Sequence, residues 1–105
     1  MKLNRNSAAV FFLAAAIVIP ALAQSGPDTY KAKCLMCHGA DGLAANNVGK
    51  AMKIPSFKDP VAVKDTDAQL FATVKNGKGK MQPFASKLTD DQIKAVVAYI
   101  RTLQK

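Results

Sequence analysis

The stretch CLMCH, residues 34–38, decides how this chain must fold. An α-helix has 3.6 residues per turn, so side chains three and four positions apart lie on the same face. Cys34, Cys37 and His38 therefore share one helix face. Gly39 follows at once and is expected to end that helix, because glycine readily adopts the backbone conformation found after helix C-termini.

This order of residues is the attachment motif of c-type haem. Two thiols on one face can add to the two haem vinyl groups, and the neighbouring imidazole reaches the iron. Three other interpretations of the motif have less support from the sequence. A disulfide between Cys34 and Cys37 would close a very small loop and add little stability, and a thioredoxin-like redox pair needs a βαβ setting. A zinc site needs four ligands, whereas the chain holds only two Cys and one His.

The N-terminal residues have the pattern of a secretory signal peptide. Lys2 and Arg5 form a basic start, residues 8–19 are an unbroken apolar run, and residues 21–23 offer a small-residue cleavage site. The run is shorter than the about 20 residues that span a bilayer. We predict that residues 1–23 are a signal peptide and that residues 24–105 form one exported domain. The expected compartment is the periplasm, in preference to a thylakoid lumen, with no membrane insertion after cleavage.

The chain is small and basic. Its 105 residues suit one domain, and 15 Lys and Arg against 7 acidic residues give a net charge of +8. A core of this size supplies only about 3–5 kcal/mol, so a bound cofactor is expected to help the chain fold. Nucleic acid is excluded as a partner for two reasons. The predicted periplasmic location does not suit a nucleic-acid-binding protein, and no stacking aromatics alternate with the lysines.

The sequence predicts an all-α fold. Thr89 followed by Gln92 makes a capping box for the last helix, whose apolar side chains recur at helical spacing at Ile93, Val96, Val97, Ile100 and Leu103. A second helix is predicted over residues 66–76, with Gly77 as its stop, and another from about Pro27 through the Cys pair. Residues 41–64 are rich in Gly, Asn, Pro and Lys and predict loops, with room for one short helix.

With these motifs, the sequence resembles a class I cytochrome c of the short single-haem kind found in bacteria and photosynthetic lumens. Members pair a Gly and an aromatic residue in the first helix with an aliphatic and an aromatic residue in the last. Gly26, Tyr30, Val96 and Tyr99 stand at the matching positions. The resemblance implies a small single-domain cytochrome c fold, in which three to five helices wrap around one covalently bound haem.

The sixth iron ligand is expected to be a methionine. Met1 leaves with the leader and Met36 lies within the Cys motif, so Met52 and Met81 remain. Residues 76–84 are similar to the family's Gly-rich loop, in which a ligating Met is closely followed by Pro and Phe. This implies Met81 as the ligand, although Gln82 separates it from Pro83, where many relatives have Met-Pro directly. His38 and Met81 are thus the predicted metal ligands. By the same analogy, a backbone carbonyl orients His38, and Pro55 is the candidate.

The predicted function is that of a monomeric, exported one-electron carrier that cycles between Fe(II) and Fe(III) and is not an enzyme. No distal imidazole is available for a peroxidase, since His38 is the only histidine. The alternative is a cytochrome subunit of a larger exported dehydrogenase or oxidase. Basic residues bracket Met81 and predict redox partner proteins with acidic docking surfaces: Lys75, Lys78, Lys80 and Lys87. A solvated lysine face that serves only solubility is the other interpretation.

Overall fold

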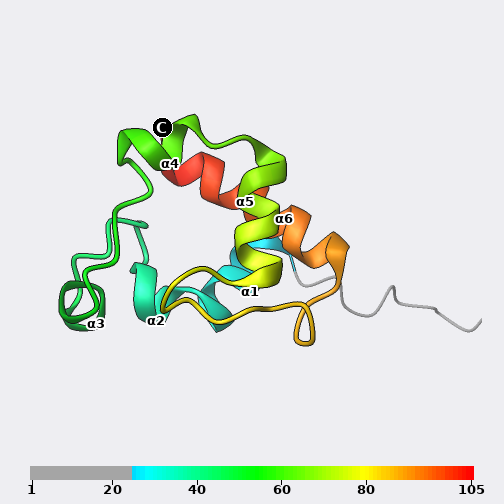
Figure 1. Cartoon of the computed structure of the whole chain (residues 1–105), viewed down its shortest axis with the longest axis horizontal. Coiled ribbons are helices and arrows are strands. Elements are labelled where there is room, and N and C mark those ends of the chain that lie inside the picture. Colours follow the sequence, from blue (N-terminus) through cyan, green and yellow to red (C-terminus); the bar gives the residue numbers. More distant parts are fainter. Residues whose placement is uncertain (1–24) are drawn as a thin grey trace, which may run out of the picture.

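The computed structural model describes residues 25–105, so the signal peptide predicted at residues 1–23 lies outside the described residues. This part of the chain is helical, as predicted, and its one β feature is a bridge between Lys78 and Met81. None of its helices is long and apolar enough to cross a membrane. Figure 1 shows the helical segments, which are α1 (Gly26–Lys33), α2 (Leu35–His38), α3 (Asn47–Ala51), α4 (Pro60–Lys64), α5 (Asp67–Asn76) and α6 (Asp90–Leu103).

Helices α5 and α6 begin at the capping boxes that the sequence predicts. Thr66 and Gln69 exchange side-chain and backbone hydrogen bonds of 2.8 and 3.1 Å, and Thr89 and Gln92 do the same at 2.8 and 3.1 Å. Each pair satisfies two backbone N–H groups that a helix start leaves without partners. Gly77 ends α5 with a φ of 78°, so the predicted stop is confirmed.

Helix α1 crosses α6 closely, at the residues that the family resemblance singled out. A side chain at Gly26 would collide with the backbone carbonyl of Ala95 and approach Tyr99. The rings of Tyr30 and Tyr99 lie 5.2 Å apart at an angle of 55°, and Val96 between the helices is fully buried. Glycine therefore sets the distance between the two helices, and the aromatic rings fill the flanks of the crossing.

Gly26→Ala is expected to destabilise the protein by about 1–3 kcal/mol, the usual cost of overpacking. In a domain of this size, that lowers the unfolding temperature by at least about 4 °C. Thermal unfolding of the haem-loaded protein measures the change. An unaltered unfolding temperature would mean that α1 and α6 can move apart to admit the methyl group, so that glycine does not set their distance.

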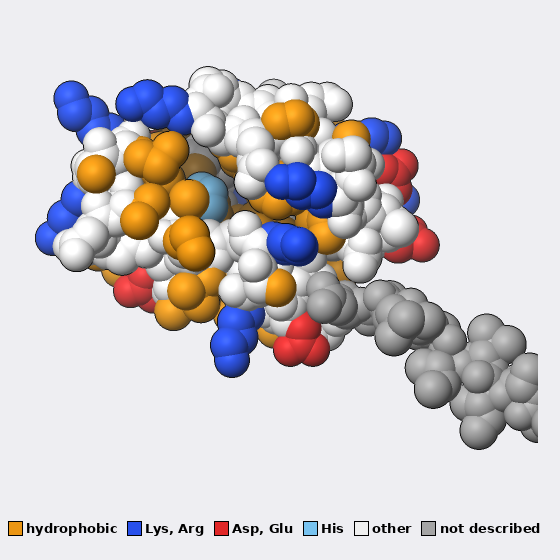
Figure 2. Space-filling view, turned by 90° about the horizontal axis from the view of Figure 1, so that it is seen from below, with side chains coloured by type: hydrophobic (Ala, Val, Ile, Leu, Met, Phe, Trp, Pro, Cys, Tyr) orange, Lys and Arg blue, Asp and Glu red, His pale blue; other side chains and the backbone are white. Residues whose placement is uncertain are grey.

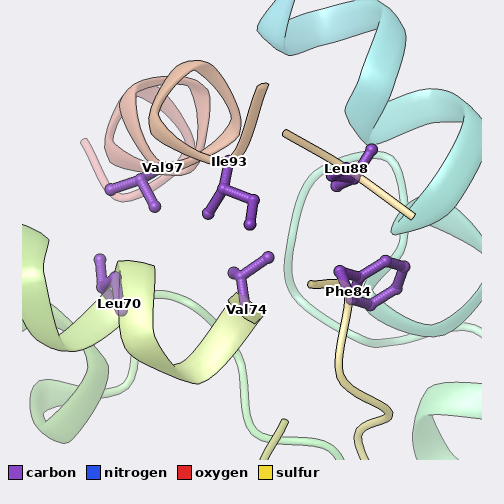
Figure 3. Close-up of a cluster of buried hydrophobic side chains, with 6 residues drawn as sticks. All are labelled: Leu70, Val74, Phe84, Leu88, Ile93 and Val97. Carbon is purple, nitrogen blue, oxygen red and sulfur yellow. The ribbon is translucent and has the colours of Figure 1, made fainter. Parts of the chain in front are cut away.

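A hydrophobic cluster joins α5, α6 and the segment between them (Figure 3). It contains Leu70, Val74, Phe84, Leu88, Ile93 and Val97. A second cluster forms around the α1–α6 crossing and contains Tyr30, Cys34, Val96 and Ile100. The sequence motif thus enters the core directly, because Cys34 belongs to the second cluster.

The structure differs from the sequence prediction in two places. The helix predicted through the Cys pair is divided at Cys34, whose φ of −117° separates α1 from α2. The described residues also form two short helices, α3 and α4, where residues 41–64 predicted room for one. Together these differences give six helical segments in place of three to five. Helix α4 starts at a local cap. The Asp59 carboxylate accepts from the Val61 N–H at 3.0 Å, and Pro60 occupies the first turn.

Candidate functional site

A cavity of about 760 Å³ lies between the two hydrophobic clusters. Its walls carry all four predicted site residues, which are Cys34, Cys37, His38 and Met81. Leu70, Val74 and Phe84 of the first cluster also line it, as do Cys34 and Ile100 of the second. In Figure 2 the pale-blue side chain of His38 lies in a hollow flanked by hydrophobic side chains. The fold therefore brings the motif and the Gly-rich loop to one space.

The two cysteines are free, and Cys34 is buried. Burial, with a smaller contribution from neighbouring Cys37, raises the pKa of the Cys34 thiol to about 11. Cys34 is therefore a neutral thiol at pH 7. Redox-active and nucleophilic cysteines have the opposite property, a lowered pKa that favours the thiolate. Cys34 therefore lacks the lowered thiol pKa of the reactive cysteine in a thioredoxin-like centre.

His38 is largely enclosed. Burial lowers the pKa of its imidazole, so the ring is neutral at pH 7 and one nitrogen offers a lone pair to a metal. The Nδ1 atom is buried and has no hydrogen-bond partner in the part of the chain that the structure describes. Pro55 lines the same cavity, but the predicted hydrogen bond to its carbonyl is absent, so that prediction is wrong for this structure.

Met81 reaches the cavity from a tight turn between α5 and α6. The Met81 N–H donates to the Lys78 carbonyl at 2.9 Å, and the Lys78 N–H donates to the Met81 carbonyl at 3.1 Å. Met81 packs against the first cluster, whereas Cys34 belongs to the second. Met52 also lines the cavity, within the wall segment 52–57 that carries Phe57 and its contact with the His38 ring. The geometry therefore brings both candidate methionines to the space and sets Met81 on the cluster that does not contain the cysteines.

Three contacts that the sequence did not predict support the motif. The Asn46 side chain donates to the Met36 carbonyl at 2.9 Å, and the Tyr30 hydroxyl donates to the Gly39 carbonyl at 2.6 Å. The Phe57 ring stacks on His38. Asn46 is also the N-cap of α3, and this cap signal was readable in the sequence. The contacts of Tyr30 and Phe57 join distant residues and have no local signal.

The lysines predicted to bracket Met81 divide into two groups. Lys78 and Lys80 are exposed and line the cavity. Lys75 instead forms an ion pair with Asp90 at 3.1 Å, and Lys87 donates to Gln82 at 2.7 Å. Of the four predicted lysines, Lys78 and Lys80 therefore stand in the cavity wall, where Lys33 and Lys53 lie as well.

The cavity and its donors fit a haem. A flat apolar macrocycle needs a large space between hydrophobic side chains, and the space lies between two such clusters. Covalent attachment needs two unpaired thiols, and both cysteines are free. A neutral imidazole and a thioether are the ligand pair of low-spin electron-transfer haems, and both side chains stand in the walls.

Comparison with known proteins points the same way. The family model described as cytochrome c oxidase, cbb3-type, subunit III matches residues 21–100. Cytochrome c6 of Leptolyngbya boryana is 36% identical over 80 residues, which cover 74% of this chain and 88% of that protein. The cbb3-type cytochrome c oxidase subunit FixP of Azorhizobium caulinodans is 29% identical over 83 residues, which cover 77% of this chain and 27% of that protein.

A solved structure agrees with these sequence relatives. The KustC0563 c-type cytochrome superposes with a TM-score of 0.70 at 30% identity, over 77% of this chain and 99% of that one. The helical fold, the cavity with its CxxCH face and these relatives lead to one conclusion: the chain belongs to the class I cytochrome c family, whose members carry covalently bound haem c.

Proposed function

We propose that this chain is an exported carrier of single electrons that holds one haem, attached at Cys34 and Cys37 and ligated by His38 and Met81. The observation that carries the proposal is that one cavity has all four side chains in its walls. The haem supplies the one-electron chemistry between Fe(II) and Fe(III). The protein holds it between two hydrophobic clusters, which exclude water from most of its surface and favour a raised reduction potential.

The roles of the side chains follow from their surroundings. The neutral His38 imidazole would give one nitrogen to the iron, and the Met81 thioether, carried on the turn at Lys78, would be the second ligand. A haem held by both His38 and Met81 would leave no position for oxygen or peroxide, and His38 is the only histidine that could act as an acid or base. We therefore propose a carrier, not an enzyme, and the relatives named above are likewise cytochromes.

The optical spectrum and the reduction potential of the purified haem-loaded protein test this function. We expect a low-spin spectrum in both oxidation states, a weak far-red band in the ferric state from a methionine–iron bond, and a potential in the range of His/Met cytochromes. A high-spin ferric spectrum would show an open axial position and would contradict the carrier function.

The predicted leader and compartment belong to this proposal. We propose that residues 1–23 direct export and are removed, and that residues 24–105 act in the periplasm as a monomer. N-terminal sequencing of the mature protein should begin at Gln24. A mature chain that starts at Met1 would contradict export through this segment.

A second function is favoured by the match to a cbb3-type oxidase subunit and by the FixP relative. In that case the chain would be a cytochrome subunit of a larger exported complex. Size-exclusion chromatography of the haem-loaded protein, purified from its native source without detergent, separates the two functions. Elution as a monomer supports the free carrier, and co-elution with other subunits supports the complex.

We further propose that Lys78 and Lys80 guide acidic redox partners to the cavity opening. Changing both to Glu should slow electron transfer with an acidic partner roughly tenfold or more at low salt, since charge complementarity acts on encounter. Stopped-flow kinetics measure the rate, and the reduction potential should barely change. Because Lys75 is paired with Asp90, Lys75→Glu should have a smaller effect.

Lys105→Glu is the control for this prediction. The Debye length at physiological salt is about 8 Å, so an exposed charge far from the contact is screened. If Lys105→Glu lowered the electron-transfer rate as much as the Lys78 and Lys80 changes, the effect would come from the general surface charge and not from these two lysines. Rates that do not respond to salt would oppose electrostatic guidance altogether.

A further inference from the structure

His38 has an unusual neighbour. Its imidazole lies face to face with the ring of Phe57, with ring centroids 4.6 Å apart and planes 20° from parallel. A histidine that ligates a metal is ordinarily oriented by a hydrogen bond from its other nitrogen to a nearby acceptor. The buried Nδ1 of His38 makes no such bond within residues 25–105. The contact that the structure does show on the imidazole plane is the stack with Phe57.

Phe57 is itself fixed on both its backbone and its ring. Its N–H donates to the Gly42 carbonyl at 2.9 Å, and its ring meets Tyr30 edge-on, with centroids 6.2 Å apart and planes at 62°. A Cβ atom at Gly42 would come within 2.5 Å of the Phe57 ring. Only glycine at position 42 therefore leaves room for the ring where it lies.

Tyr30 connects this ring back to the haem motif. It is only 2% exposed, and its hydroxyl donates to the carbonyl of Gly39, the residue that follows His38, at 2.6 Å. Contacts thus run in a closed circuit from the imidazole to Phe57, to Tyr30 and back to the backbone beside His38. The Phe57 ring therefore cannot turn without displacing the ring of Tyr30 or of His38.

The geometry points to Phe57 as the positioning residue that fixes the rotation of the His38 imidazole about its bond to iron, an inference that rests on the proposed function. Two nearly parallel rings at this separation leave no space for one to rotate, because its edge would enter the face of the other. The imidazole plane selects which iron d orbital it overlaps in the ferric state. It therefore determines how unpaired spin spreads over the porphyrin.

Proton NMR of the ferric, haem-loaded protein tests this role. The four haem methyl groups report the spin distribution through their paramagnetic shifts. Phe57→Leu and Phe57→Met each remove the flat ring and keep an apolar side chain of similar size. Both are expected to change the order or spacing of the four methyl shifts, while the haem stays covalently attached and the methionine–iron band remains. Phe57→Tyr keeps the flat face and should restore the parent pattern.

Phe71→Leu is the matched control. Phe71 packs against the first hydrophobic cluster and does not line the cavity, so the same chemical change there should lower stability without altering the methyl pattern. The inference is overturned if Phe57→Leu and Phe57→Met keep the parent pattern, or if Phe71→Leu alters it equally. A parent protein without a histidine-ligated haem would instead overturn the proposed function, so the two failures are distinguishable.

Discussion

The double change Cys34→Ala and Cys37→Ala is expected to abolish covalent haem attachment and leave most of the chain unfolded. The cavity occupies about 760 Å³ between two small hydrophobic clusters. Without the haem, the apolar walls of this space would be open to water, and a core of this size supplies only about 3–5 kcal/mol by itself. Haem staining after denaturing electrophoresis measures attachment, and circular dichroism measures folding.

Met36→Ala is the control, because Met36 lies between the two cysteines and is 75% exposed. It should retain haem and helix content. Each single Cys→Ala variant should keep some haem through the remaining thioether and give a lower folded yield. Haem that survives electrophoresis of the double variant would contradict attachment at these residues. A native-like spectrum of the haem-free chain would contradict the stabilising role of the haem.

Met81→Ala is expected to remove the weak far-red band of the ferric protein and to lower the reduction potential by roughly 0.1 V or more, given the wide range of potentials that axial ligands set. A thioether favours ferrous iron, whereas water or hydroxide in its place favours ferric iron. Haem should remain attached, since Cys34 and Cys37 are unchanged. Absorption spectroscopy and potentiometric titration give both readings.

Met52→Ala is the decisive comparison, because Met52 also lines the cavity. It should leave the far-red band and the potential close to those of the parent. If Met52→Ala were the variant that lost the band, the wall segment 52–57 would supply the ligand. The assignment of the turn at Lys78 and Met81 would then be wrong.

The sequence alone predicted where helices start and end, because these points depend on residues a few positions apart. The capping boxes at Thr66 and Thr89 are formed by residues three apart, so sequence spacing alone identifies both helix starts. The glycine stops after α2 and α5 follow from the same kind of rule, since Gly39 and Gly77 both have positive φ. The α1–α6 crossing was predictable only through the family resemblance, because nothing local pairs residues so far apart.

The short helices, the contacts of Phe57 and the orientation of His38 could not be predicted from the sequence, for physical reasons. Helices α3 and α4 each contain five residues, too few for a hydrophobic period to be recognised. Phe57 lies in an irregular segment, and its importance comes from contacts with Tyr30 and His38 that only the folded chain creates. The prediction that Pro55 orients His38 was wrong because a backbone carbonyl's direction depends on loop geometry. No residue type in that loop encodes it.

Mass spectrometry of the mature protein after alkylation and tryptic digestion tests covalent haem attachment most directly. Cleavage after Lys33 and Lys50 releases residues 34–50, which contain both cysteines and His38. We predict that this peptide carries the mass of one haem and that neither cysteine is alkylated. Recovery of residues 34–50 with both cysteines alkylated and no haem would contradict a covalently bound haem at this motif.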